Sequence, residues 1–128
     1  MIALVPQRKA FDCGVAALSM WGHIEYEDAY ALAISRFGAS VRYGLQLKEM
    51  RLLAKLLGHD LRVVHYRRVD LEDDSGILGV NWTTMSGGHW VVLRKGTIID
   101  PAKAQVWDAD EYIRTHEARV GSLLTEDV

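Results

Sequence analysis

Asp12-Cys13-Gly14-Val15-Ala16-Ala17-Leu18-Ser19-Met20-Trp21 is a run in which one acidic residue precedes a series of small or apolar ones. On a helix these side chains would be apolar nearly all the way round, which is typical of a helix buried at the centre of a domain. Asp12 stands where a helix N-cap is expected, and Gly22 follows where the helix can end. The sequence therefore predicts a buried central helix with Cys13 in its first turn.

Two further segments of the first half have helical periodicity. The first covers about residues 26–37 and is followed by Gly38. The second covers about residues 45–57, has leucines along one face, and is followed by Gly58. Glycine directly after an apolar helical pattern is a common C-terminal stop, so we expect each helix to end there.

The second half changes to the shorter period of β-strands. We expect strands over residues 60–66, 76–82, 89–94, 97–100 and 105–107. Lys95-Gly96 predicts a two-residue turn that joins the third and fourth strands into a hairpin. Asp108 is expected to cap a last helix that runs to about His116. Helices followed by an antiparallel sheet predict an α+β fold, and we expect residues 1–128 to form one domain.

The composition is that of an ordinary globular protein. The chain has 128 residues, of which 49% are hydrophobic and 25% are charged, which excludes a disordered tail, a collagen-like fibre and a coiled coil. Fifteen basic and seventeen acidic side chains give a net charge of −2. Because there is no overall positive field to attract nucleic acid or anionic lipid, we expect neither as a partner.

Cys13 is the only cysteine. It excludes an intrachain disulfide and a cysteine-rich metal site, and the histidines do not have metal-ligand spacing, so we expect no metal and no cofactor. No segment approaches the roughly 20 apolar residues of a membrane span. Cysteine usage favours a reducing compartment, which predicts a cytoplasmic protein. The sequence gives no indication of the oligomeric state.

Cys13 is a candidate nucleophile because of its place in the first turn of the central helix. The N–H groups and the dipole at a helix N-terminus favour the thiolate, which is the nucleophilic form of cysteine. A buried structural cysteine would occupy the same position equally well, because free cysteine is among the most buried residue types.

His89 and Asp100 lie on the two strands of the expected hairpin. His89 follows a glycine pair and opens an apolar strand, and Asp100 ends the partner strand. If residues 95–96 form the turn, position 91 lies opposite position 100, so Asp100 lies near the His89 end. A carboxylate there can accept an imidazole N–H and fix the tautomer. The alternatives are a strand-edge histidine and an aspartate that starts a turn. Together with Cys13, however, the two residues would form a Cys–His–Asp triad.

Three blocks of the chain occur in a recognisable order. They are Val5-Pro6-Gln7 followed by residues 12–18; the segment from Gly44 to Gly58; and Gly88-His89-Trp90-Val91-Val92-Leu93 followed by residues 98–102. In order and spacing, over about residues 4–107, they resemble the bacteriocin-processing, double-glycine cysteine peptidases. The resemblance covers nearly the whole chain, and it depends on the combination of blocks.

The resemblance implies a papain-like fold, in which a central helix carries Cys13 and a facing antiparallel sheet carries His89 and Asp100. It also implies that the side-chain amide of Gln7 joins the Cys13 backbone N–H in an oxyanion hole. In that family the peptidase domain usually precedes a membrane-spanning transporter; this sequence contains none, so we expect a standalone domain.

The predicted function is that of a cysteine peptidase that cuts a peptide or isopeptide bond after glycine. The partner would be a peptide or protein with a Gly-Gly-like site, and Gly88 and Trp90, which flank His89, are the candidate substrate-binding residues. Two alternatives stay open. The same triad could transfer an acyl group to an amine, as in a transglutaminase, or the domain could bind a peptide without cutting it. Binding alone, however, would require none of the triad residues.

Overall fold

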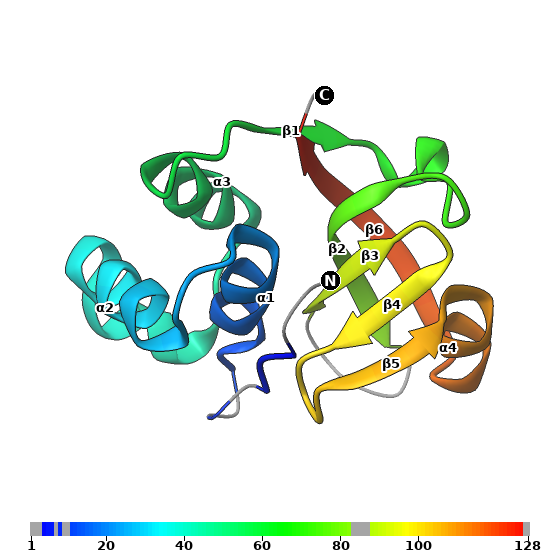
Figure 1. Ribbon diagram of the computed structural model, residues 1–128, viewed down its shortest axis with the longest axis horizontal. Coiled ribbons are helices and arrows are strands. Elements are labelled where there is room, and N and C mark those ends of the chain that lie inside the picture. The colour runs from blue at the N-terminus through cyan, green and yellow to red at the C-terminus, as the bar shows by residue number, and fades with distance from the viewer. Residues whose placement is uncertain (1–3, 7, 9–10, 83–87, 127–128) are drawn as a thin grey trace.

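The helices and the strands of the chain form two halves that meet along the first helix (Figure 1). The computed structural model describes residues 4–6, 8, 11–82 and 88–126. The helical half contains α1 (Cys13–Gly22), α2 (Tyr26–Phe37), the 3₁₀ helix η1 (Gly38–Tyr43) and α3 (Leu47–Leu56). The other half contains β1 (Leu61–Val64), the 3₁₀ helix η2 (Tyr66–Arg68), β2 (Ser75–Trp82), β3 (Gly88–Arg94), β4 (Thr97–Asp100), β5 (Gln105–Asp108), α4 (Ala109–Thr115) and β6 (Ala118–Glu126).

The predicted central helix is α1. Every residue from Cys13 to Met20 is buried, because the helix lies between α2 and α3 on one side and the sheet on the other (Figure 1). This burial explains why its sequence is apolar nearly all the way round.

Asp12 occupies the N-cap position of α1, but its side chain does not cap the helix. Its carboxylate is 3% exposed and accepts hydrogen bonds from the Tyr26 hydroxyl of α2 and, at 2.9 Å, from the Arg8 backbone N–H. The prediction of an Asp12 cap is therefore wrong, because the Tyr26 hydroxyl and the Arg8 N–H bind the carboxylate in place of the first turn of the helix.

The other two helices match their predictions with one shift. α2 covers the predicted residues, whereas α3 begins two residues later than expected. Gln46 has an extended backbone and forms a capping box with Glu49, whose carboxylate accepts the Gln46 N–H at 2.8 Å. The helix therefore starts at Leu47, and the chain between α2 and α3 forms η1, which the sequence pattern did not indicate.

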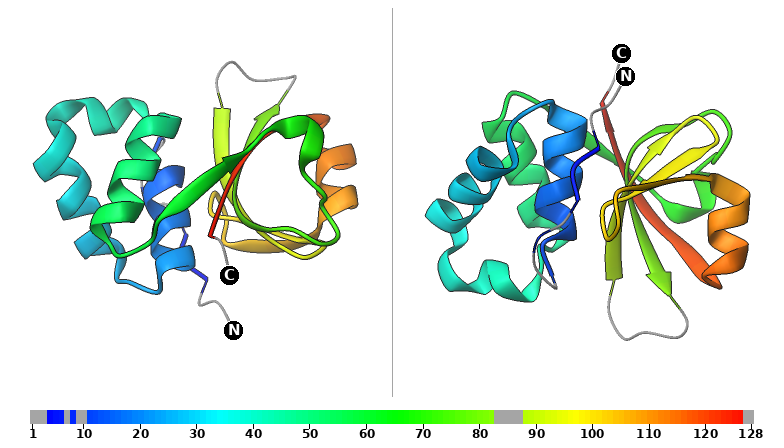
Figure 2. Two further views of the ribbon diagram at one scale, coloured as in Figure 1. Left: turned by 90° about the horizontal axis from the view of Figure 1, so that it is seen from above. Right: turned by 60° about the horizontal axis from the view of Figure 1, so that its bottom comes forward.

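The strands form one antiparallel sheet in the order β1-β6-β2-β3-β4-β5, and the sheet curls strongly (Figure 2). Both of its faces are covered. Ile77, Val92, Ile99 and Leu124 pack into the cluster with α1, α2 and α3. Leu78, Val91, Ile98 and Leu123 pack on the opposite face with Ala109 and Tyr112 of α4.

Strand β6 was not predicted, although it lies in the interior of the sheet between β1 and β2. Two features hide it in the sequence. Leu123 and Leu124 are adjacent but enter different cores, so the strand does not alternate between apolar and polar residues. In addition, the register with β2 shifts between Leu78 and Val80, opposite Gly121 and Ser122.

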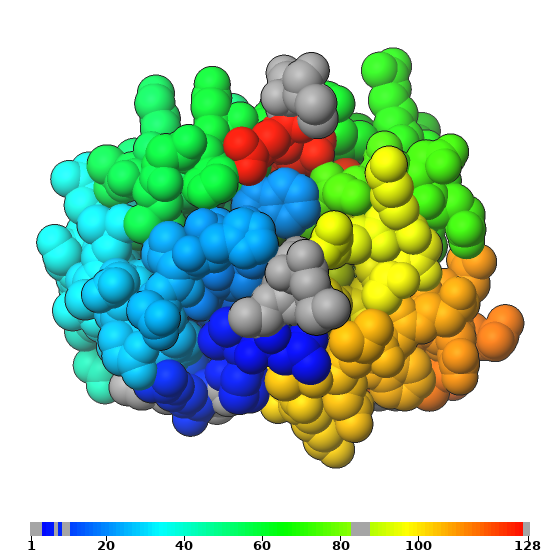
Figure 3. Space-filling model, in the orientation of Figure 1, coloured from blue at the N-terminus to red at the C-terminus, as the bar shows by residue number. Residues whose placement is uncertain are grey.

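The N-terminal segment and the C-terminal end of β6 both help to join the two halves. In Figure 3 the dark-blue start of the chain lies between the helices and the yellow strands. At the end of β6, one carboxylate oxygen of Glu126 accepts the Trp21 indole N–H at 3.0 Å and contacts His59 Nδ1 at 2.6 Å. These contacts connect the last strand to α1 and to the residues after α3.

Gly76 in β2 has no room for a side chain, which gives the first testable prediction. A Cβ there would lie 2.2 Å from the Leu124 carbonyl oxygen of β6. We expect Gly76→Ala to lower the free energy of unfolding by about 3 kcal/mol, because a backbone atom must move. Gly22→Ala is the control, since the nearest atom to its new Cβ is 3.5 Å away. Equal urea midpoints for the two variants would contradict the close pairing of β2 and β6.

Candidate active site

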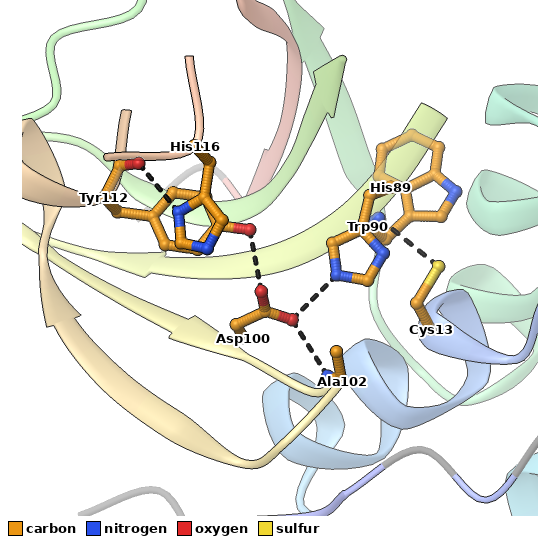
Figure 4. Close-up of polar contacts among 7 residues, drawn as sticks. All are labelled: Cys13, His89, Trp90, Asp100, Ala102, Tyr112 and His116. Carbon is orange, nitrogen blue, oxygen red and sulfur yellow. Dashed lines mark hydrogen bonds and ion pairs between the residues drawn. The ribbon is translucent and has the colours of Figure 1, made fainter. Parts of the chain in front are cut away.

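Cys13 lies at the point where α1 meets β3. It is the first residue of α1 and is 8% exposed. The backbone N–H of Trp90 in β3 donates a hydrogen bond to Cys13 Sγ at 3.4 Å. This contact places the thiol beside the strand that carries His89 (Figure 4).

The hairpin of β3 and β4 brings His89 and Asp100 together. Lys95 and Gly96 both have positive φ, 35° and 85°, as a tight two-residue turn requires. The register that follows pairs Val92 with Ile99, so position 91 lies opposite position 100. His89 is two residues from position 91, and its Nε2 lies 2.7 Å from Asp100 Oδ1. The structure thus has the register that the sequence predicts.

The imidazole of His89 lies between the Asp100 carboxylate and the Cys13 thiol (Figure 4). Burial disfavours the charged form of the ring. Hydrogen bonds to Asp100 and Cys13, together with the charges of these two groups, act in the opposite direction and raise the pKa of His89 to about 9. The ring is therefore protonated at neutral pH, and a thiolate beside it would be paired with a cation.

Three donors converge on the carboxylate of Asp100. Oδ1 contacts His89 and accepts the Ala102 N–H at 2.8 Å, while Oδ2 accepts the Tyr112 hydroxyl at 2.8 Å. Burial favours the neutral acid, but these donors and the charge of His89 hold the pKa of Asp100 below its usual value. Asp100 consequently stays ionised over the whole neutral range.

Sequence reasoning did not identify Tyr112. The residue is fully buried on α4, and only its position on the apolar side of a short helix could have drawn attention to it. A buried tyrosine usually finds a partner for its hydroxyl, but the sequence does not show which partner. The position of α4 beside Asp100 depends on how the sheet curls, which local sequence patterns do not show.

The two candidate substrate-binding residues lie beside His89, as their sequence positions require. Trp90 bridges the halves of the molecule, because its indole N–H donates to the Leu45 carbonyl at 2.8 Å. Its ring lies against Gly14 of α1 and Gly79 of β2, where added Cβ atoms would come within 3.2 and 3.3 Å. Gly88 pairs with Asn81 across β2 and β3.

A cleft of about 750 Å³ opens beside Cys13 and His89. Its lining includes Cys13, His89, Gly88 and Trp90. From there it extends along the segment of residues 40–49, which precedes and begins α3, and over Gly79, Gly121 and Ser122 of the sheet. The cleft is large enough for several residues of an extended peptide, and Cys13 lies in its wall.

The fourth candidate catalytic residue, Gln7, lies outside the described residues. Within the described ranges, no three His, Cys, Asp or Glu side chains are grouped so that they could hold a metal ion. No helix in that part of the chain is long and apolar enough to cross a membrane. The described residues that the structure does bring together are a thiol, an imidazole and a carboxylate, those of Cys13, His89 and Asp100.

Comparison with known proteins identifies the fold. No family model matches the chain, and no curated protein matches its sequence. The crystal structure of a double glycine motif protease from an AMS/PCAT transporter, in complex with the leader peptide, is similar with a TM-score of 0.65. The match covers 99% of this chain and 93% of that chain at 18% sequence identity. The helices and curled antiparallel sheet therefore match a papain-like peptidase fold, and the predicted fold is confirmed at this level.

Proposed function

We propose that this protein is a cysteine peptidase that cuts a peptide or isopeptide bond after glycine. The observation that carries the proposal is the arrangement of three side chains: Asp100 lies 2.7 Å from His89, and the His89 ring lies next to the Cys13 thiol. A nucleophile, a base and a group that orients the base are the parts required for acyl transfer through a thioester. The similar protease was solved with a leader peptide, which supports a peptide as the substrate.

In the proposed reaction the Cys13 thiolate attacks the carbonyl carbon of the scissile bond. The C–N bond then breaks as His89 donates its proton to the leaving amine, and a thioester on Cys13 remains. Water attacks the thioester while His89 accepts one of its protons. The C–S bond then breaks, and the peptide leaves as a carboxylic acid that loses its proton to the solvent. The Cys13 thiolate and the protonated His89 of the starting state are thereby restored. Asp100 holds the ring of His89 in one orientation through both steps.

The tetrahedral intermediates require hydrogen-bond donors for the oxyanion. We assign this role to the Cys13 backbone N–H and to the side-chain amide of Gln7, as the family resemblance implies. The conformation of Asp12 is compatible with this assignment. Because its carboxylate is bonded to Tyr26 and Arg8, it does not cap the first turn of α1.

The preference for glycine is proposed from the walls of the cleft. Gly88 and Trp90 lie on either side of His89, and the Trp90 ring is fixed by Leu45 and packed against Gly79. A ring held on both sides cannot move aside for a substrate side chain near the scissile bond. A displacement of about 1 Å at the reacting carbonyl can lower the rate around 10²-fold, so a residue without Cβ is favoured there.

A matched set of peptides tests this preference. The peptides differ only in the two residues before the cut, which are Gly-Gly, Ala-Ala or Leu-Arg. We expect kcat/KM to be at least about 10²-fold higher for Gly-Gly than for Leu-Arg. The reason is that only glycine fits between Cys13 and His89 without displacing the carbonyl of the scissile bond. A Gly-Gly isopeptide substrate should be included to determine which bond is preferred.

The control for the panel is hydrolysis by Cys13→Ala, which removes the proposed nucleophile and should cut none of the peptides. Equal or faster turnover of the Leu-Arg peptide by the unmodified protein would contradict the narrow cleft. That result would indicate an open specificity pocket while leaving the triad chemistry in place.

A further inference from the structure

The hydroxyl of Tyr112 makes a buried hydrogen bond that the proposed reaction does not use directly. Tyr112 is fully buried on α4, and its Oη donates to Asp100 Oδ2 at 2.8 Å. Burial and the charge of Asp100 raise the pKa of the Tyr112 hydroxyl, so this group stays protonated and keeps its donor. The contact is therefore present at any pH at which the protein would work.

The donors around Asp100 are divided between its two oxygens. Oδ1 is shared by His89 and the Ala102 N–H, whereas Oδ2 is held by Tyr112. A carboxylate held only through one oxygen can turn about its terminal bond, because this torsion has a broad energy minimum. A second donor on the other oxygen fixes the plane of the group and hence the direction in which Oδ1 faces His89.

α4 is itself attached to the hairpin that carries His89 and Asp100. The N-cap Asp108 accepts the Glu111 N–H at 3.1 Å, as the sequence predicts. The N–H of Ala109 donates to the Gly96 carbonyl, in the turn between β3 and β4, at 2.8 Å. Tyr112 therefore belongs to the same structural unit as the two residues, whereas Cys13 comes from α1.

Aromatic rings surround this unit and restrict movement within it. Trp82 packs on His89 with ring centroids 5.3 Å apart, and His116 packs on both Trp82 and Tyr112 at 5.0 and 4.2 Å. Among the described residues, the titratable groups that face His89 are thus Cys13 from α1 and Asp100 from β4. Tyr112 of α4 and His116, which follows that helix, lie on the other side of Asp100 (Figure 4).

We propose that Tyr112 is a positioning residue, whose hydroxyl fixes the rotation of the Asp100 carboxylate so that Oδ1 holds His89 toward Cys13. This inference rests on the proposed function for its effect on turnover. Its effect on His89 is a property of the folded protein and needs no substrate. Tyr112 acts through Asp100 and does not touch the reacting atoms.

The test is Tyr112→Phe, which removes the hydroxyl and keeps the ring. Without its second anchor the carboxylate turns, and its hydrogen bond to His89 weakens. We expect the pKa of His89, measured by NMR titration, to fall by about one unit toward the ordinary histidine value. We also expect kcat to fall roughly tenfold with KM unchanged, because a mispositioned base affects the transition state more than binding.

Tyr26→Phe is the matched control. Tyr26 is also a buried tyrosine, 5% exposed, and its hydroxyl also donates to an aspartate, Asp12. We expect it to cost a similar amount of stability and to leave the pKa of His89 where it is. The His89 resonance is identified by its absence from His89→Gln.

Two results would overturn the proposal. An unchanged pKa of His89 in Tyr112→Phe would mean that the hydroxyl only supports packing. A raised pKa of His89 in Tyr112→Phe would mean that the Tyr112 hydroxyl withdraws charge from Asp100 without orienting the carboxylate. If the unmodified protein cuts no peptide, the peptidase proposal fails, but the titration still decides whether Tyr112 positions Asp100.

Discussion

Cys13→Ala is expected to abolish peptide cleavage while leaving the fold intact. Removing the nucleophile of a triad typically costs on the order of 10⁴–10⁶ in kcat, because no thioester can form. The substitution removes one sulfur atom from a site that is already mostly buried, at 8% exposure, so we expect the melting temperature to change by only a few degrees. Cleavage of a Gly-Gly peptide and thermal unfolding, followed on the same sample, check both statements.

The same variant has a second expected effect, on His89. The thiol contributes to the raised pKa of this ring through a hydrogen bond and its charge. In Cys13→Ala the pKa of His89 should therefore fall below about 9. Cleavage by Cys13→Ala at the rate of the unmodified protein would mean that another group attacks the substrate. A titration of His89 that does not change would mean that the ring and the thiol are not in contact.

Asp100→Ala is expected to have the second largest effect. The substitution removes the group that orients His89 and leaves the Tyr112 hydroxyl and the Ala102 N–H without their acceptor. Loss of the orienting aspartate in a triad costs up to about 10⁴ in kcat. We expect a loss of roughly 10²–10⁴ in kcat/KM for a Gly-Gly peptide, together with lower stability because the buried Tyr112 hydroxyl loses its acceptor.

Asp100→Asn separates the charge of this residue from its shape and gives the pH dependence. The pKa of His89 is raised to about 9, so its charged form is present at neutral pH and is lost as the pH rises through about 9. The stabilisation that comes from this charge is complete below the unfolded-state pKa of about 6.5. It is lost as the pH rises from there through the folded-state pKa of about 9. We therefore expect the activity of the unmodified protein to decline above about pH 9.

In Asp100→Asn this decline should move to lower pH, because the neutral amide no longer raises the pKa of His89. The measurement is kcat/KM against pH for both proteins, with circular dichroism to show that the fold persists at each pH. If the two profiles decline at the same pH, the group that controls the basic limb is not His89 paired with Asp100.

The parts of the site that could be predicted from sequence are those set by local rules. Cys13 follows from one apolar helix and its starting residue. The contact between His89 and Asp100 follows from a two-residue turn, because a tight turn determines which residues face each other across a hairpin. Two short patterns thus locate three side chains, and only the meeting of α1 with β3 required the folded structure.

The parts that could not be predicted depend on contacts between distant segments. β6 escapes detection because Leu123 and Leu124 enter different cores, and a strand buried on both faces does not alternate. Tyr112 depends on where α4 lies after the sheet has curled. Asp12 had the residue type of a helix cap, but a buried tyrosine from α2 and a backbone N–H bind its carboxylate instead. In each case a tertiary contact outweighs the local preference.

The central claim is that Cys13 forms an acyl-enzyme with a substrate that ends in glycine, and covalent labelling tests it most directly. A peptide ending in Gly-Gly with a C-terminal vinyl sulfone is incubated with the folded protein, and the product is measured by intact mass. Because the chain has one cysteine, an adduct on a thiol is assigned without ambiguity. We expect one probe per protein, located on Cys13, with labelling lost in urea and strongly reduced in His89→Gln and for a Leu-Arg probe. Labelling that proceeds equally in urea, or that is absent from the folded protein, would contradict an activated Cys13 in a glycine-selective cleft.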